Sequence, residues 1–233
     1  MIFIYGGRHF PKEIIILCVR WYVTYRLSYR DLVDMMAERG VYVSHSTILR
    51  WVLRFIPEFV KRWDRHRRAV GCPWRADETY IPIKGEWHYL YRAVDSRGRT
   101  VDFYLSEQRD IRAAMTFFRK ALASHPNKPP RKITVDGYKA THRALRLLRR
   151  RNPTWRRVVV RSCQYFNNIV EQDHRAIKRR VAAMLGFRTF YSAATTLMAI
   201  ELAHRIRKRQ FSIGYRRGQR YGSLAGAWAL ALT

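Results

Sequence analysis

The sequence predicts a mixed α/β domain, in which helices flank a sheet, preceded by an all-α domain of the helix-turn-helix type. Up to residue 66, apolar side chains recur at helical spacing. From Ala76 onward the period shortens to two residues, and strand-like segments then alternate with helical ones. The chain has 233 residues, of which 48% are hydrophobic, so it can bury the core of one medium domain and of a smaller one.

Three helical segments make up the N-terminal domain, which we predict to span residues 1–66. Ser28 is suited to cap the second helix, and Gly40 is suited to end it. Either Ser44 or Ser46 can then cap the third helix. A helix, a short turn that contains glycine and a second helix are typical of a helix-turn-helix.

The start of the third helix is the part expected to enter a DNA major groove. The candidates for base or phosphate contact are His45, Ser46, Thr47 and Arg50. Basic residues continue along and beyond this helix, which favours DNA binding over the alternative, a three-helix bundle that serves dimerisation. Residues 67–75 contain glycine, proline and a run of charges, and we predict a linker there.

The predicted sheet domain spans residues 76–188. Turn sequences at residues 84–86 and 96–98 divide its first part into a three-stranded antiparallel meander. The following segments alternate, giving the order βββαβαβα: helix 110–123, strand 132–135, helix 138–150, strand 158–160 and helix 167–180. A further helix and a basic tail occupy residues 189–233, and the sequence assigns no role to the part beyond residue 209.

The charge of the chain points to a polyanionic partner. Lysine and arginine number 46 against 17 acidic residues, a net charge of +29 that is spread along the whole chain. Nucleic acid is the leading candidate, ahead of a ribosomal-type protein or a membrane-surface binder. No apolar run is long enough to span a bilayer, so we expect a cytoplasmic protein without membrane association. The three cysteines are widely spaced and predict neither disulfides nor a zinc site.

Three carboxylates have a pattern suited to metal binding. Asp77 and Asp136 lie on strand-like segments, and Glu171 lies on a later helix. Oxygen ligands of this kind suit Mg²⁺ or Mn²⁺, and two such ions can assist phosphoryl transfer. We therefore predict that Asp77, Asp136 and Glu171 hold two divalent cations.

The other acids near these positions fit different roles. Glu78 follows Asp77 directly on a strand, so it should point to the opposite face and act as a structural or supporting residue. Asp95 should shape a turn, Asp102 should face solvent, and Asp110 should cap a helix. Asp173 lies about 160° around the helix from Glu171, so it should not share a site with it.

The helix around Glu171 carries cations on the same face. Lys178 lies two turns beyond Glu171, and Arg175 lies close to the same face, so both are candidates to bind a DNA phosphate. The alternative is a solvated basic surface. His174 is also near Glu171, where it can orient a reacting group or, more commonly, serve as a packing and hydrogen-bonding group.

Three long motifs carry a resemblance to a known family. They read DETYI..KGEW.YLYRAVD from residue 77, TVDGY from residue 134, and NNIVEQDHRAIKRRVAAMLGFRTF from residue 167. With them the chain, from about Gly7 to about Arg207, closely resembles the bacterial DDE transposases of the insertion-sequence-six family. The segment VDGYKATHR, the first five residues and the part beyond Arg209 depart from the family pattern.

The resemblance implies an RNase H-like DDE catalytic core at residues 76–188, in which the first and fourth strands are neighbours. It implies that Asp77, Asp136 and Glu171 are the catalytic, metal-binding triad, accompanied by the basic Lys178. It further implies binding of terminal inverted repeats, metal-dependent cleavage and strand transfer into target DNA, a replicative mode that forms cointegrates, and a homodimer or higher oligomer on DNA.

Two other functions remain compatible with the residues. One is a catalytically silent repressor derived from a transposase, which the complete carboxylate set argues against. The other is an RNase H-like nuclease that cuts without joining, which the separate helix-turn-helix argues against.

Overall fold

The computed structural model describes residues 9–25, 27–126, 129–163, 168–183, 187–213 and 224–232. The chain forms two compact units. Met1–Arg67 and Thr189–Thr233, with Ala183–Leu185, make up the first unit, and Arg68–Ala182 with Gly186–Arg188 make up the second. The two ends of the chain therefore share one unit, and the sheet domain is the other.

Within the described residues, the first unit consists of helices and the segments that connect them. The helices are α1 (Lys12–Thr24), α2 (Tyr29–Ala37), α3 (His45–Asp64), α8 (Phe190–Arg207) and α9 (Leu224–Leu232). Ser28 forms a capping box with Asp31 at the start of α2, as the sequence predicts for a cap at this position. Ser44, not Ser46, caps α3 by accepting a hydrogen bond from the Thr47 N–H. Gly40 has a φ of +70°, the left-handed conformation that ends α2.

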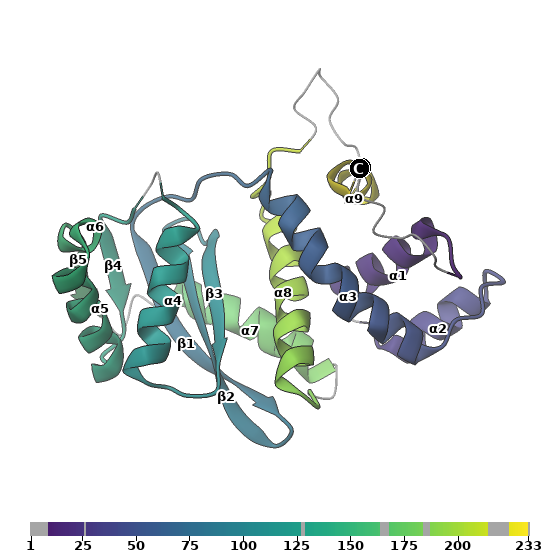
Figure 1. Ribbon diagram of the computed structural model, residues 1–233, viewed down its shortest axis with the longest axis horizontal. Coiled ribbons are helices and arrows are strands. Elements are labelled where there is room, and N and C mark those ends of the chain that lie inside the picture. Colours follow the sequence, from purple (N-terminus) through teal and green to yellow (C-terminus); the bar gives the residue numbers. More distant parts are fainter. Residues whose placement is uncertain are drawn as a thin grey trace. The chain divides into compact units, whose positions relative to one another are not determined.

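The core of this unit lies around α3, which packs against α1, α2, α8 and α9 (Figure 1). The aromatic rings of Phe59, Trp63 and Trp228 meet edge to face, and Trp228 brings α9 into this core. The basic stretch of the tail at residues 214–223 lies outside the described residues.

The second unit is a mixed α/β domain. Its elements are β1 (Trp74–Ile83), β2 (Glu86–Asp95), β3 (Thr100–Ser106), α4 (Ile111–Ala123), β4 (Lys132–Val135), α5 (Lys139–Arg151), α6 (Pro153–Arg156), β5 (Val159–Ser162) and α7 (Asn168–Ala183). The sheet order is β3-β2-β1-β4-β5. β1, β2 and β3 form the predicted antiparallel meander, and β4 and β5 run parallel to β1. This is the RNase H-like arrangement, with the first and fourth strands as neighbours; only the short α6 was not predicted.

Helices cover both faces of this sheet (Figure 1). The ring of Tyr91 on β2 stacks on Phe117 of α4, whereas the next residue, Arg92, forms an ion pair with Asp173 of α7. Because successive residues of a strand point to opposite faces, α4 and α7 lie on opposite sides of the sheet.

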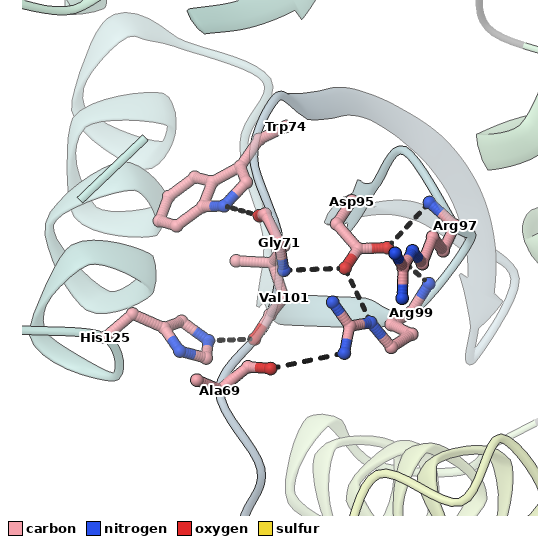
Figure 2. A network of polar contacts seen from close by, with 8 residues as sticks. All are labelled: Ala69, Gly71, Trp74, Asp95, Arg97, Arg99, Val101 and His125. Carbon is pink, nitrogen blue, oxygen red and sulfur yellow. Dashed lines mark hydrogen bonds and ion pairs between the residues drawn. The ribbon is translucent and has the colours of Figure 1, made fainter. Parts of the chain in front are cut away.

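Asp95 organises the turn between β2 and β3, which confirms the prediction that it shapes a turn. Figure 2 shows its carboxylate accepting hydrogen bonds from the backbone of Arg97, Arg99 and Gly71 and from the Arg99 side chain. Burial on its own would raise the pKa of Asp95, but these hydrogen bonds outweigh it and hold the pKa below its ordinary value. Through Gly71, Asp95 also anchors the segment that leads into β1, where the buried Trp74 donates to the Gly71 carbonyl.

The prediction that Asp102 faces solvent is wrong. Its side chain is only 8% exposed, and it accepts hydrogen bonds from Lys120 and Ser124, at the C-terminal end of α4. Burial would raise the pKa of Asp102, but the Lys120 charge and these hydrogen bonds lower it. The strand pattern could not indicate this, because both partners lie far along the chain.

Within the ranges that the structure describes, each helix is too short or too polar to cross a lipid bilayer.

Candidate active site

The centre of the site lies where β1 and β4 run side by side. Trp74 and Arg75 pair with Ile133 and Thr134 in parallel register. Continued two residues further, this register sets Asp77 beside Asp136, which directly follows the last residue of β4. The prediction that these two aspartates lie together is confirmed, because their carboxylates belong to one cluster of potential metal ligands.

Glu78 is the third member of this cluster. Asp77, Glu78 and Asp136 each offer one oxygen, and the three oxygens lie within 4.8 Å of one another. Glu78 pairs across the strands with Tyr91, so it belongs to the α4 face, as strand alternation predicts. Its carboxylate also accepts a hydrogen bond of 2.7 Å from Arg109 Nε. Glu78 therefore combines the expected structural role with a position beside the two aspartates, which sequence spacing alone did not reveal.

The electrostatics of the cluster favour a bound cation. Burial, followed by the charges of Glu78, Asp136 and Glu171, raises the pKa of Asp77 to about 7. Burial also raises the pKa of Glu78, although Arg109 opposes the shift. Like charges held this closely repel one another, and a divalent cation bound by their oxygens removes that repulsion.

Helix α7 presents one face to this cluster. Val170, Ile177 and Val181 are buried and form an apolar stripe along the described part of the helix. His174 Nδ1 lies 3.8 Å from Asp77 Oδ2. Since Glu171 is one turn before His174, its side chain lies on the side of α7 that faces Asp77. The effect of the Glu171 charge on the pKa of Asp77 is consistent with this position.

His174 is a neutral group in this environment. Burial, and then the charges of Arg92 and Lys178, lower its pKa to about 3. His174 is therefore a buried and neutral imidazole. This state fits the role of a packing and hydrogen-bonding group better than the role of a group that orients a reacting atom.

The remaining predicted residues of α7 are exposed. Glu171, Arg175 and Lys178 all reach solvent, and Lys178 lies close enough to His174 to influence its pKa. Glu171 lies outside the group of three carboxylates that meet within 4.8 Å, so its role as a metal ligand stays a prediction.

Two arginines of the site were not singled out by sequence reasoning. Arg92 is fully buried beside Asp77, its cross-strand partner, and its Nη2 lies 3.1 Å from Asp173 Oδ2. Arg109 binds Glu78 and stacks its guanidinium over the Tyr138 ring at 3.8 Å. The sequence did carry a signal for Arg92: it is an arginine on a strand face that otherwise packs inward, and a buried arginine needs a partner.

The predicted DNA-contact residues of the other unit gather at the start of α3. His45, Ser46 and Arg50 are exposed, and Thr47 is half-buried. Arg50 donates a hydrogen bond of 3.1 Å to the Thr47 hydroxyl. The buried residues Ile48, Trp51, Val52 and Phe55 line the opposite side of the helix. The exposed side of α3 is therefore polar and basic, and its role stays a prediction.

Comparison with known proteins assigns the family. A family model described as a DDE domain matches residues 71–210. The transposase for the insertion sequence-like element IS431mec of Staphylococcus aureus (strain Mu50 / ATCC 700699) is 36% identical over 202 residues, covering 87% of this chain and 88% of that protein. The chain belongs to the insertion-sequence-six family of bacterial DDE transposases.

A second S. aureus transposase, that of the insertion sequence element IS257 in transposon Tn4003, shows the same 36% identity and the same coverage. Among solved structures, the catalytic core domain of HTLV-2 integrase in complex with magnesium aligns with a TM-score of 0.43 and 13% identity, covering 71% of this chain and 99% of that one. Membership of the family makes the chain an enzyme, a polynucleotidyl transferase that acts in transposition.

Proposed function

We propose that this transposase cuts DNA at the ends of its insertion sequence and joins the freed ends to target DNA, using two divalent cations held by Asp77, Asp136 and Glu171. The observation that carries the proposal is the meeting of Asp77, within β1, and Asp136, directly after β4, with Asp77 facing His174 of α7. The ions are Mg²⁺ or Mn²⁺, because hard oxygen ligands suit both.

The residues present fit such ions. The cluster consists of carboxylate oxygens, and burial, followed by the charges of neighbouring carboxylates, raises the pKa of Asp77, so a bound cation would favour its ionised form. When bound, two cations supply an activated oxygen nucleophile and neutralise charge on the leaving oxygen in phosphoryl transfer. Glu171 completes the ligand set from α7, and Lys178 on the same helix holds a phosphate of the DNA end.

Recognition of the element ends belongs to the helix-turn-helix. In this proposal the first turns of α3 enter the major groove, with His45, Ser46, Thr47 and Arg50 contacting bases or phosphates. Arg175 adds a phosphate contact beside the carboxylates. Because two ends must be held together for reaction, the transposase works as a homodimer or a higher oligomer on DNA. We further propose a replicative mode that produces cointegrates, as the family resemblance implies.

The test incubates the protein with a labelled element end and a target plasmid. The three conditions are wild type with Mg²⁺, wild type with EDTA, and the Glu171→Ala variant with Mg²⁺. We expect wild-type protein to nick and join the end with Mg²⁺, and to do neither with EDTA. Glu171→Ala should bind the end like wild type but not cut it. Glu78→Gln is the comparison that separates the two acids near Asp77: it should retain more activity than Glu171→Ala, because Glu78 is already bound to Arg109.

Two other outcomes would replace the proposal. End binding that is equal in all conditions, with no cut strand, would identify a silent DNA-binding repressor. Metal-dependent cutting without any joining would identify a nuclease. For the helix-turn-helix, Arg50→Ala should weaken end binding about 10-fold and reduce the slope of log K against log salt by about 1 if Arg50 contacts a phosphate.

A further inference from the structure

A hollow between α4 and α5 lies next to the carboxylate cluster, and four of its ten lining residues are arginines. Its volume is about 630 Å³, and its polar lining includes Arg109, Arg112, Thr116, Arg119, Tyr138 and Arg151. All of these residues belong to the sheet domain. The site described above uses Arg109 alone of these arginines, so the others need a separate explanation.

Three of the arginines are available to a ligand. Arg112, Arg119 and Arg151 are exposed, and none of them forms an ion pair with another described residue. The one acid in the lining is Asp110, and its carboxylate accepts a hydrogen bond of 2.7 Å from the Ala113 N–H as the cap of α4. The lining therefore carries four arginine charges against the one carboxylate of Asp110, which gives the hollow a net positive charge.

The arginines are spread out along the helices rather than gathered at one point. Arg112 and Arg119 are seven residues apart on α4, which places them on the same side of the helix about 10 Å apart. Arg151 lies at the C-terminal end of α5, and Tyr138 directly precedes that helix. An extended row of guanidinium groups suits a chain of phosphates better than a single small anion, and the rise of about 3.4 Å per nucleotide in one strand lets the row span several phosphates.

One end of the hollow touches the carboxylate cluster. Arg109 binds Glu78, and its guanidinium stacks on the ring of Tyr138. The Tyr138 N–H in turn donates a hydrogen bond of 3.1 Å to Asp136 Oδ1, and its hydroxyl donates to the Arg109 carbonyl at 2.7 Å. A strand lying along α4 and α5 would thus bring one of its phosphates to the edge of the carboxylate cluster formed by Glu78 and Asp136.

We propose that this arginine-lined hollow binds the backbone of target DNA and delivers a target phosphate to the carboxylate cluster. Target DNA is the occupant, because recognition of the element ends is assigned above to the helix-turn-helix, and a row of guanidinium groups binds backbone phosphates in DNA of any sequence. This inference rests on the proposed function, since it assumes that the carboxylate cluster joins DNA.

The experiment compares two triple variants of the full chain. Arg112→Gln/Arg119→Gln/Arg151→Gln removes three charges from the hollow. Arg143→Gln/Arg146→Gln/Arg150→Gln removes three charges from exposed positions of α5 that do not line it. Both variants should melt at the wild-type temperature, because every substituted side chain is exposed.

Two measurements are made on each protein. The first is binding of an unrelated duplex over a series of salt concentrations, without divalent metal. The second is joining of a pre-bound element end to increasing amounts of target plasmid. We expect the hollow variant to bind the unrelated duplex at least 10-fold more weakly than the control, with a slope of log K against log salt that is shallower by about 2–3. It should also need at least 10-fold more target plasmid for half-maximal joining, while binding of the element end stays at the control level.

Other results would overturn the inference. A hollow variant that matches the control in both measurements would show that the arginines are a solvated surface. A selective loss of element-end binding would show that the hollow holds the element end and not the target. Inorganic phosphate that raises the melting temperature of wild type but not of the hollow variant, with DNA binding unchanged, would show a small-anion site. Because the duplex-binding measurement needs no catalysis, weaker binding in a protein that never joins DNA would retain the DNA site and refute only the proposed function.

Discussion

Arg92 Nη2 lies 3.1 Å from Asp173 Oδ2, and this ion pair connects β2 to α7 beside the candidate active site. Arg92 is the cross-strand partner of Asp77, and Asp173 is two residues from Glu171. Arg92 is fully buried and Asp173 is 12% exposed, so solvent screens this pair only weakly. The pair is placed to set the separation between the strand that carries Asp77 and the helix that carries Glu171.

The first prediction concerns this ion pair. Arg92→Met should lower the free energy of unfolding by about 3–5 kcal/mol, because it removes the buried cation that pairs with the largely buried Asp173 carboxylate. It should also reduce strand joining at saturating DNA, because α7 loses its link to β2. Urea unfolding and a joining assay on the same preparation measure the two effects.

The double variant Arg92→Met/Asp173→Leu distinguishes positioning from stability. Replacing both charges with apolar groups should restore most of the free energy of unfolding. Joining should stay low, and the concentration of Mn²⁺ that half-saturates binding, followed by calorimetry, should rise. Arg92→Lys, which keeps the charge, should recover part of the metal affinity. A double variant with wild-type joining and metal affinity would show that the pair serves stability alone.

The second prediction is a pH dependence that originates at Asp77. Its pKa is raised to about 7 in the folded chain, from an ordinary value of 3.8. A carboxyl group with a raised folded pKa contributes stability that is fully present below its unfolded pKa and is lost as the pH rises through the folded pKa. Without divalent metal, stability from this group should therefore fall between about pH 4 and pH 7, the range between the unfolded and the folded pKa.

Asp77→Asn removes this titration. At pH 8 in EDTA the variant should be more stable than wild type by roughly 1–3 kcal/mol, and the difference should shrink toward pH 5. Urea unfolding at both pH values measures it, with Glu107→Gln, an exposed acid of the same unit, as the control. Added Mn²⁺ should stabilise wild type more than the Asn variant. If the free energy of unfolding of wild type and of Asp77→Asn changed with pH in parallel, the pH dependence would not originate at Asp77.

The third prediction concerns the hydrogen bonds of Asp95 shown in Figure 2. Asp95→Ala should lower the free energy of unfolding by about 2–4 kcal/mol, because the N–H groups of Gly71, Arg97 and Arg99 lose their acceptor. The pKa of Asp95 is lowered, so its contribution is present above the unfolded pKa and is lost as the pH falls through the folded value. Wild type should therefore lose more stability than Asp95→Ala on acidification below about pH 4.

Urea unfolding at neutral and acidic pH measures this difference. Glu107→Gln should follow wild type at both values, since its side chain is exposed. An Asp95→Ala protein that unfolds like Glu107→Gln at neutral pH would show that the network contributes little to stability.

The features that the sequence could predict are those that depend on local pattern. The change from helical to strand period located the sheet domain, and local chemistry identified the caps at Ser28 and Asp110. The adjacency of Asp77 and Asp136 followed from strand order once the fold was assigned.

The features that could not be predicted depend on contacts between distant segments. Strand alternation indicates which face Arg92 occupies but not that Asp173 meets it there, 81 residues later. Asp102 was expected in solvent because Lys120 and Ser124 lie on a helix whose placement the strand pattern does not specify. The apolar composition of α9 indicates burial, but it does not indicate that the helix packs on α3.

The last prediction concerns that packing of α9. Trp228 is fully buried, with its ring 5.5 Å from the ring of Trp63 and 5.8 Å from that of Phe59. Trp228→Ala should lower the free energy of unfolding of the helical unit by about 3–5 kcal/mol, because it leaves a large cavity beside α3. Trp87→Ala is the matched control, since Trp87 is 63% exposed and its loss should change stability by less than about 0.5 kcal/mol. Urea unfolding followed by circular dichroism at 222 nm, the standard helix signal, measures both.

Because α3 also carries the predicted DNA-contact residues, Trp228→Ala should weaken element-end binding at temperatures where the helical unit begins to unfold and leave it unchanged well below them. Equal unfolding midpoints for the two variants would show that α9 contributes nothing to this core.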